Sequence, residues 1–279
     1  MSAAEPAAWH AVTVRGAIDR SAVSAALFAA GAEGVWEQAD GLVTHLPADA
    51  ALESVQAAVR AVAPAAEITV APAPFVDWST AWQSQLTARE AGDFIVTPPW
   101  LMGTVDPARA IVIEPGMGFG TGDHPTTRGV LRLLPGVIRP GDQVADLGAG
   151  SAVLAIAAAK RGAARVWAIE LDPPAIPNAE LNVQANGVAD RVTVLEGDAQ
   201  VLLPLVAPVR VVVANIISSV LVELFPAIRA SVSAEWVLLV SGVLVTERAH
   251  LLSVVEAEGW RLDAEDMEGE WWSARIVAG

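Results

Sequence analysis

The chain is predicted to form a doubly wound, mainly parallel α/β sheet preceded by a small ferredoxin-like α+β domain. In residues 144–198, apolar runs alternate with helical stretches, and successive runs end at a Gly-rich turn over 146–150, at Glu170 and at Asp198. A further run ends at the lone amide Asn215. Apolar strands that alternate with helices indicate a parallel sheet covered on both faces. Their carboxyl ends meet in one crevice, where this architecture binds nucleoside-bearing cofactors.

The amino-terminal part has its own order of elements. Extended runs at 10–14, 34–37, 42–46 and 67–70 are interleaved with a helix that starts after Asp19 or Ser21 and a second helix over 50–62. The resulting βαββαβ order predicts a ferredoxin-like domain. Prolines 72 and 74 mark its boundary and suggest a hinge, and residues 75–88, with Trp78 and Trp82 four apart, predict a connecting helix that packs on a neighbouring domain. We expect a small domain over 1–72, a linker over 73–100 and the doubly wound domain over 101–279.

The elements of the larger domain follow from apolar periodicity and helix-end signals. An extended run at 110–113 leads into residues 114–127, where four glycines within seven residues allow close approach to a ligand. Asp123 or Thr126 is expected to cap the next helix. Strands are then expected at 144–147, 166–169, 192–195, 209–214, 236–240 and 270–277, and helices at 152–161, 175–186, 218–229 and 246–257.

Composition narrows the class of protein. The 279 residues suggest two domains, and the formal net charge of −15 repels nucleic-acid phosphate, so we expect no direct nucleic-acid binding. That charge would attract a basic partner, or it serves only solubility. With no cysteine, disulfides and thiolate metal sites are excluded. No secretory signal is visible, and Pro204, Pro208, Arg210 and Asn215 interrupt the most apolar stretch. A cytoplasmic monomer outside the membrane is expected.

Four residues mark the predicted cofactor crevice. Gly148 and Gly150 let the turn pass close to a ligand, and Glu170, 22 residues after Gly148, is placed to accept hydrogen bonds from both ribose hydroxyls. Asp198 is placed to face the exocyclic amine of an adenine. The alternatives are a solvated strand-end acid for Glu170 and a turn acid for Asp198.

The residue before the turn distinguishes between cofactors. Asp146 would repel a diphosphate but tolerate the ammonium and sulfonium of S-adenosylmethionine. The third glycine of a dinucleotide fingerprint is replaced by Ala152 or Val153, which leaves no room for a pyrophosphate on the helix. We therefore favour S-adenosylmethionine over a nicotinamide cofactor.

The sequence resembles the bacterial methyltransferases of large-subunit ribosomal protein L11, the PrmA type. The resemblance is carried by the loop at 119–127, by 146–151 with 154–158, by 170–173 with 186–188, and by 213–216, and short motifs at 242–244 and 269–271 also match. The glycine turn is common to most class I methyltransferases, whereas His124-Pro125-Thr126-Thr127 combined with Ala214-Asn215-Ile216 is much more specific. The resemblance is best from about residue 110 onward.

This resemblance implies a Rossmann-like class I methyltransferase that uses S-adenosylmethionine to methylate lysine or N-terminal amines of ribosomal protein L11, with the amino-terminal domain recognising the substrate. It implies cofactor contacts from the hydroxyl of Thr127, the backbone of Gly148, Glu170 and the amide of Asn215. Two departures are Glu170, where the family commonly has Asp, and Ala152, which replaces the last glycine of the turn.

Asn215 is the expected catalytic residue. Its side-chain oxygen, or adjacent backbone carbonyls, would accept hydrogen bonds from a neutral amine and aim the lone pair; the alternative is an Asn that caps the helix at Ser218. His124 is not expected to act as a base, and the scattered histidines predict no metal site. Three other functions stay open: methylation of another protein or a small amine, a non-catalytic cofactor-binding module, and a nicotinamide oxidoreductase.

Overall fold

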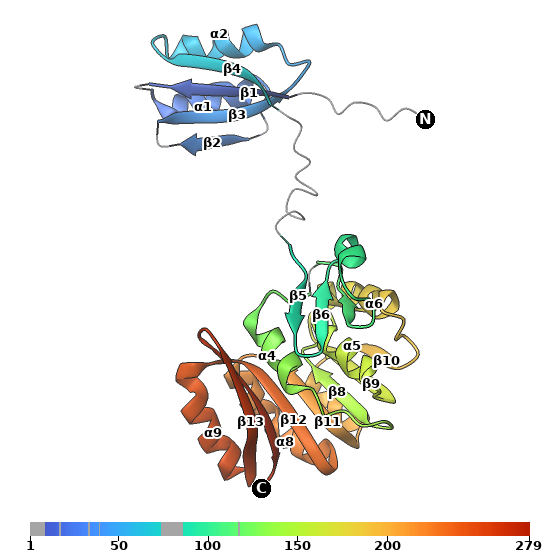
Figure 1. Ribbon diagram of the computed structural model, residues 1–279. Coiled ribbons are helices and arrows are strands. Elements are labelled where there is room, and N and C mark those ends of the chain that lie inside the picture. The colour runs from blue at the N-terminus through green and yellow to red at the C-terminus, as the bar shows by residue number, and fades with distance from the viewer. Residues whose placement is uncertain (1–8, 17, 33, 39, 74–85, 117) are drawn as a thin grey trace. The chain divides into compact units, whose positions relative to one another are not determined.

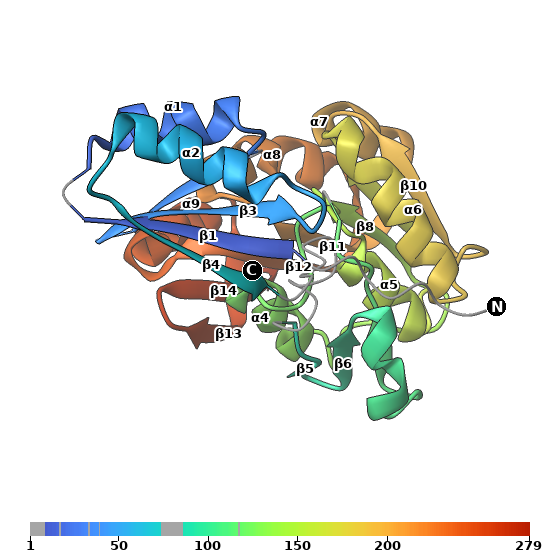
Figure 2. The ribbon, with the colours of Figure 1, turned by 90° about the horizontal axis from the view of Figure 1, so that it is seen from above.

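The computed structural model describes residues 9–16, 18–32, 34–38, 40–73, 86–116 and 118–279. It divides into two compact units, Met1–Gln85 and Leu86–Gly279, each of which is described by itself (Figures 1 and 2). The predicted connecting helix over 75–88, with Trp78 and Trp82, lies mostly outside the described residues. Of that stretch, residues 86–88 are described and have no regular structure.

The first unit is a four-stranded antiparallel sheet in the order β2-β3-β1-β4, which is the ferredoxin-like arrangement predicted from the sequence. Both helices lie on one face of this sheet (Figure 2). Helix α1 starts after Asp19, not Ser21: the Asp19 carboxylate accepts a hydrogen bond from Ala22 N at 3.1 Å. The elements are β1 (Trp9–Arg15), α1 (Arg20–Ala29), β2 (Val35–Gln38), β3 (Gly41–Pro47), α2 (Leu52–Val62) and β4 (Glu67–Ala73).

The second unit contains a seven-stranded sheet in the order β10-β9-β8-β11-β12-β14-β13 (Figure 1). The first five strands are parallel, and β14 and β13 are antiparallel to their neighbours. The chain runs outward from β8 to β10 and then returns to place β11 beside β8, so the strand order reverses between β8 and β11. The strands are β8 (Gln143–Leu147), β9 (Arg165–Glu170), β10 (Val192–Glu196), β11 (Val209–Asn215), β12 (Val232–Leu244), β13 (Trp260–Glu268) and β14 (Trp271–Ala278).

Helices cover both faces of this sheet, as a doubly wound fold requires. Along β11, Val211 and Val213 join an apolar cluster with one set of helices, and Val212 and Ala214 join a cluster with the other set, because successive side chains of a strand point to opposite faces. One set comprises α4 (Pro125–Leu133), α5 (Val153–Lys160) and α6 (Ile176–Ala185), and the other comprises α8 (Ser218–Ser231) and α9 (Arg248–Ala257), with the short α7 (Ala199–Leu202) before β11.

Several details differ from the sequence prediction. Residues 89–97, expected in the linker over 73–100, form β5 (Arg89–Ala91) and β6 (Phe94–Thr97), which pair with β7 (Ala110–Val112) in a small sheet of the second unit. This unit therefore begins before residue 101. Strand β13 was not predicted. Helix α4 is capped by His124, not by Asp123 or Thr126: Asp123 instead pairs with Arg89 at 2.6 Å. None of the described helices is long and apolar enough to cross a membrane.

Candidate functional site

The turn after β8 packs against two neighbouring segments so closely that it needs glycine. Gly148 and Gly150 have φ values of 69° and 54°, in the left-handed region. A Cβ on Gly148 would lie 2.7 Å from Ile216 Cγ2, and one on Gly150 would lie 2.4 Å from the carbonyl oxygen of Phe119. The turn thus lies between the end of β11 and the loop at residues 114–127, called the Gly-rich loop below. It lies at the point where the strand order reverses. Ligands of open α/β sheets bind at such a point.

Glu170 lies directly against this turn. Its Oε2 accepts a hydrogen bond from Gly150 N at 2.7 Å, and its Oε1 accepts one from Asp172 N at 2.8 Å. Since a carboxylate offers about four lone-pair positions, each oxygen keeps capacity for a further donor. The side chain is only 9% exposed, so Glu170 is a fixed acceptor at the crevice and not a solvated strand-end acid.

Asp146 lies under the turn, fully buried. Its Oδ2 accepts a hydrogen bond from Ala155 N in the first turn of α5 at 2.8 Å, while its Oδ1 has no hydrogen-bond partner. Burial raises the pKa of this carboxyl to about 7, with a smaller contribution from the charge of Glu170, and the Ala155 hydrogen bond opposes the rise. A cation nearby would stabilise the charged form of this buried carboxyl, whereas a diphosphate would destabilise it.

The Gly-rich loop is docked on the glycine turn. Ser151 N donates to the carbonyl of Phe119 at 2.8 Å, and Ser151 Oγ donates to the carbonyl of Gly120, also at 2.8 Å. A Cβ on Gly118 would lie 2.8 Å from Gly150 C, so this approach also depends on a missing side chain. The prediction of a loop beside the site agrees with this geometry.

Three asparagines of α6 and its C-cap hold the start of this loop, and sequence reasoning missed them. Asn182 receives a hydrogen bond from Glu114 N at 2.8 Å and donates to Ser151 O at 3.1 Å. Asn178 donates to Glu114 O, and Asn186 exchanges two hydrogen bonds with the backbone of Val112. Their spacing of four residues places them on one helix face, and that repeat is a signal the sequence contains.

Asn215 and Thr127 meet at the carboxyl end of β11. Asn215 Nδ2 lies 3.5 Å from Thr127 Oγ1, and Thr127 is completely buried in α4. The alternative role of Asn215 as a helix cap is not seen, because the N-cap of α8 is Ile217 and no side chain caps it. Gly242 in β12 has a φ of 80° and lets the strand approach Ile216 closely, which fixes the backbone next to Asn215.

Asp198 follows β10, an edge strand of the sheet. It is the N-cap of α7, and its Oδ1 accepts a hydrogen bond from Gln200 N at 2.8 Å. The preceding Gly197 donates its N–H to the carbonyl of Glu170 at 2.8 Å, so the ends of β9 and β10 are joined. The turn role considered for Asp198 is therefore present, and contact with an adenine stays a prediction.

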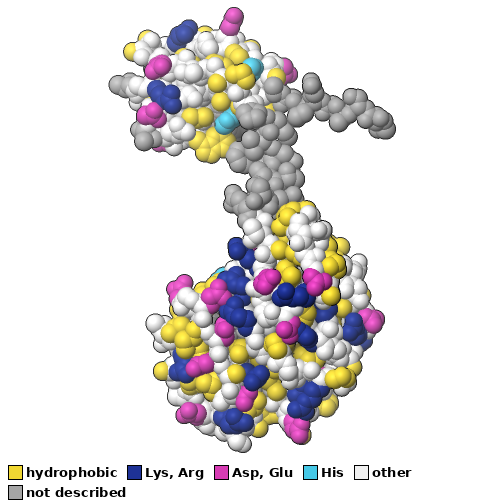
Figure 3. Space-filling view, viewed as in Figure 1, with side chains coloured by type: hydrophobic (Ala, Val, Ile, Leu, Met, Phe, Trp, Pro, Cys, Tyr) yellow, Lys and Arg dark blue, Asp and Glu magenta, His cyan; other side chains and the backbone are white. Residues whose placement is uncertain are grey.

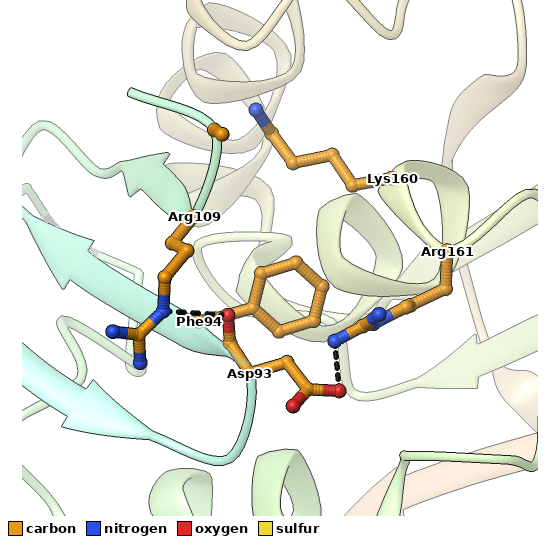
Figure 4. A pocket seen from close by; sticks show the side chains of 6 residues that line it. Asp93, Phe94, Arg109, Lys160 and Arg161 are labelled. Carbon is orange, nitrogen blue, oxygen red and sulfur yellow. Dashed lines mark hydrogen bonds and ion pairs between the residues drawn. The ribbon is translucent and has the colours of Figure 1, made fainter. Parts of the chain in front are cut away.

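A pocket lies away from these residues. It is lined by Asp93, Phe94, Arg109, Lys160 and Arg161 (Figure 4), together with Ala108. Lys160 and Arg161 are at the end of α5 opposite the glycine turn. Arg161 pairs with Asp93, and its guanidinium carbon lies 4.8 Å from the Phe94 ring centroid. Burial and then the charge of Arg191 lower the pKa of Lys160. This pocket does not belong to the crevice.

The described residues contain no group of three or more His, Asp or Glu side chains that could hold a metal ion. On the face of the second unit seen in Figure 3, Lys and Arg side chains are interspersed with Asp and Glu.

Comparison with known proteins shows to which family the chain belongs. The family model described as "Ribosomal protein L11 methyltransferase (PrmA)" matches residues 14–278. The ribosomal protein L11 methyltransferase of Thermus thermophilus is 37% identical over 248 residues, covering 88% of this chain and 90% of that protein. The corresponding protein of Pelotomaculum thermopropionicum is 35% identical over 253 residues, covering 86% and 82%.

A solved structure supports the same family. The ribosomal protein L11 methylase of Lactobacillus delbrueckii subsp. bulgaricus superposes with a TM-score of 0.59 at 25% identity, covering 66% of this chain and 94% of that one. Together with the family match over nearly the whole sequence, this shows that the chain belongs to the ribosomal protein L11 methyltransferase (PrmA) family.

Proposed function

We propose that the chain is an S-adenosylmethionine-dependent N-methyltransferase that modifies lysine or N-terminal amines of ribosomal protein L11. The observation that carries the proposal is the meeting of Asn215 with Thr127 at the carboxyl end of β11, beside the glycine turn that ends β8. A cofactor site and a polar group able to aim an amine thus lie at one point of the sheet. Membership of the PrmA family supports the choice of reaction and acceptor.

The residues of the crevice suit this cofactor. S-adenosylmethionine, when bound, supplies a methyl group on a positively charged sulfur. Glu170 has unused acceptor capacity for ribose hydroxyls, and Gly148 and Gly150 leave the turn open to close approach. The charge of Asp146 would be balanced by a cationic ligand, and Asp198 is at the position proposed for the adenine. Thr127 would contact the cofactor through its hydroxyl.

Asn215 is proposed to orient the acceptor. Because its Nδ2 faces the Thr127 hydroxyl, its Oδ1 is the atom left to accept a hydrogen bond from an amine. A lysine amine, with an ordinary pKa of about 10.4, attacks only after it loses a proton, and burial beside a cation lowers that pKa. A nitrogen–carbon bond then forms as the sulfur–carbon bond breaks, and a nitrogen-bound proton leaves to solvent. Alignment and exclusion of water are the main contributions of the protein.

We further propose that the enzyme acts in the cytoplasm, as a monomer, on the protein and not on nucleic acid. The net charge of −15 supports a protein acceptor, since a basic ribosomal protein would be attracted and nucleic-acid phosphate repelled. Light scattering of the purified chain tests the monomer. A gel-shift titration with ribosomal RNA at low salt tests the absence of direct nucleic-acid binding.

Intact mass spectrometry tests the reaction. The purified chain is incubated with S-adenosylmethionine and unmodified ribosomal protein L11, and the acceptor should gain whole methyl groups. Asn215→Ala should abolish or strongly reduce the gain. Lys160 is the one lysine of the chain, so a parallel Lys160→Arg enzyme separates modification of the acceptor from self-modification. An unchanged acceptor mass, with cofactor binding shown by calorimetry, would favour another acceptor or a non-catalytic binding module.

A further inference from the structure

The pocket at the carboxyl end of α5, called the basic pocket below, is lined by Asp93, Phe94, Ala108, Arg109, Lys160 and Arg161. Three separate segments form it: the β5–β6 hairpin, the residues before β7, and the end of α5. Figure 4 shows Lys160 extended across the top of the pocket, with Arg109 and Arg161 on opposite sides of the Phe94 ring. Its volume of about 540 Å³ lies within the range of roughly 300–1,000 Å³ that is usual for small-molecule sites.

The charge of the basic pocket is opposite to that of the whole chain. Acidic residues outnumber Lys and Arg by 32 to 17 in the sequence, yet the pocket has three cations, Arg109, Lys160 and Arg161, and one carboxylate, Asp93. Because like charges repel at short range, gathering these cations raises the free energy of the folded state unless an anion is close to them. Asp93 neutralises only one of the three charges.

The two arginines keep hydrogen-bond donors for a further acceptor. Arg161 pairs with Asp93, and its guanidinium carbon lies 4.8 Å from the Phe94 ring centroid, which holds the group over the ring. Arg109 Nε donates to the carbonyl of Asp93 at 3.2 Å, and its ion pair with Glu90 is long, at 3.7 Å, and exposed to solvent. Since a guanidinium has five N–H donors, these contacts leave most of them unused.

Lys160 has no side-chain hydrogen bond or ion pair with any residue that the structure describes. Although the residue is exposed overall, partial burial and then the charge of Arg191 lower its pKa. An anion in the pocket would favour the charged ammonium. Lys160 and Arg161 also suit the negative end of the α5 dipole, but that role does not account for Arg109, which comes from a separate segment.

We propose that the basic pocket binds a small phosphate-class anion, either inorganic phosphate or a phosphate monoester, through Arg109, Lys160 and Arg161. Arginine presents planar donors that match the oxygens of a phosphate group, and lysine adds a point charge. A single phosphate group fits this local charge, whereas a polymer of phosphates would also meet the acidic surplus of the chain.

This site is distinct from the cofactor crevice. The basic pocket lies at the carboxyl end of α5, whereas the glycine turn precedes the amino end of that helix. An eight-residue helix is about 12 Å long, so an anion in the pocket does not occupy the place proposed for S-adenosylmethionine.

NMR of the single lysine tests the site directly. Because Lys160 is the one lysine of the chain, lysine labelled with ¹³C at Cε gives one side-chain signal. The full chain is titrated at low salt with inorganic phosphate and, separately, with ribose 5-phosphate. We expect a saturable shift of this signal and a rise in the pKa of Lys160. Tighter binding of ribose 5-phosphate would identify a monoester as the ligand, and tighter binding of inorganic phosphate would identify the free anion.

Two substitutions should change the affinity in opposite directions. Lys160→Gln removes a positive charge and should raise the Kd for phosphate about fivefold, as one unit charge at about 4 Å in water implies. Asp93→Asn removes the competing carboxylate from Arg161 and should lower the Kd by a similar factor. Arg60→Gln is the matched control, because Arg60 is exposed on α2 of the first unit and the same charge is lost. Calorimetry gives the three values.

Three results would overturn the inference. In the first, the Lys160 signal moves no more with phosphate than with sodium chloride at the same ionic strength. In the second, Lys160→Gln and Asp93→Asn bind phosphate as the wild type does. In the third, a short RNA binds more tightly than either small anion and loses its affinity in Lys160→Gln, which would make the pocket a nucleic-acid contact. None of these measurements involves methyl transfer, so each outcome leaves the proposed function to its own test.

Discussion

Asn215 Nδ2 lies 3.5 Å from Thr127 Oγ1, which joins the end of β11 to α4 across 88 positions of sequence. In the proposed mechanism, this contact orients the amide and leaves its oxygen to accept a hydrogen bond from the amine. The two residues were implied by separate motifs, and the fold brings them together because α4 packs beside the carboxyl end of β11.

Removing the Thr127 hydroxyl should slow transfer without unfolding the protein. Thr127→Val keeps the volume of a fully buried side chain, so the amide of Asn215 loses its partner while the packing stays. One hydrogen bond contributes about 1 kcal/mol, which corresponds to roughly a fivefold loss of kcat. Initial rates and thermal unfolding should be measured together. Thr104→Val, at an exposed position, is the control, and an unchanged kcat in Thr127→Val would remove the orienting role of this hydroxyl.

Glu170→Gln should weaken cofactor binding. Both carboxylate oxygens accept backbone N–H groups, from Gly150 and Asp172, and an amide would turn a donor toward one of them. The turn then loses a charge-assisted hydrogen bond and the ribose loses an acceptor, so we expect the Kd for S-adenosylmethionine to rise at least about tenfold. Calorimetry gives this value directly. Wild-type affinity in the glutamine variant would mean that the ribose is held elsewhere.

Asp146 should make stability and cofactor binding depend on pH. Its pKa is about 7 in the folded chain against an ordinary 3.8, so the folded state binds the proton more tightly than the unfolded state. The stability from this group is complete below about pH 4, is lost as pH rises toward 7, and does not change further above that. In urea unfolding between pH 4 and 8, the free energy of unfolding should therefore fall less steeply with rising pH for Asp146→Asn than for the wild type.

The same group should respond to a cationic ligand. A bound cation favours the ionised carboxylate, so binding of S-adenosylmethionine should release a proton near pH 6.5. Calorimetry in buffers of different ionisation enthalpy counts that proton. The Asp146→Asn variant should release none, and an equal proton count in both proteins would contradict the assignment.

The sequence alone was sufficient to predict which site residues lie at the ends of strands. Gly148, Gly150 and Glu170 lie together because the carboxyl ends of adjacent parallel strands meet at one edge of the sheet, which a pattern of apolar runs predicts. The βαββαβ order of the first unit was predictable from apolar periodicity, because each helix or strand buries one face and its apolar residues repeat with the period of that element.

Other parts depended on contacts between segments far apart in sequence. His124 caps α4 through Nδ1, which Asp or Thr would ordinarily do, while Asp123 pairs with Arg89, 34 positions away. Strands β5 and β6 are only three and four residues long, too short for their periodicity to be recognised. The rings of His124 and Trp271 pack with their centroids 4.9 Å apart, and no local sequence pattern predicts that contact.

Gly242 should be required for both stability and activity. Its φ is 80°, and a Cβ there would lie 2.5 Å from Ile216 O and 2.7 Å from Ile216 C, so Gly242→Ala must displace the residue that follows Asn215. Gly136→Ala is a matched control, because Gly136 has a φ of 75° with nothing within 4 Å of the added carbon. Both variants bear the left-handed penalty of about 1–2 kcal/mol.

The difference between the two variants isolates the close approach. We expect Gly242→Ala to lose at least about 1 kcal/mol more stability than Gly136→Ala in urea unfolding, and to lower kcat about tenfold or more. Gly136→Ala should keep its kcat, because no proposed site residue adjoins it. If the two variants unfold at the same urea concentration and turn over equally fast, the packing of β12 on Ile216 does not position Asn215, and the amide must be held by Thr127 alone.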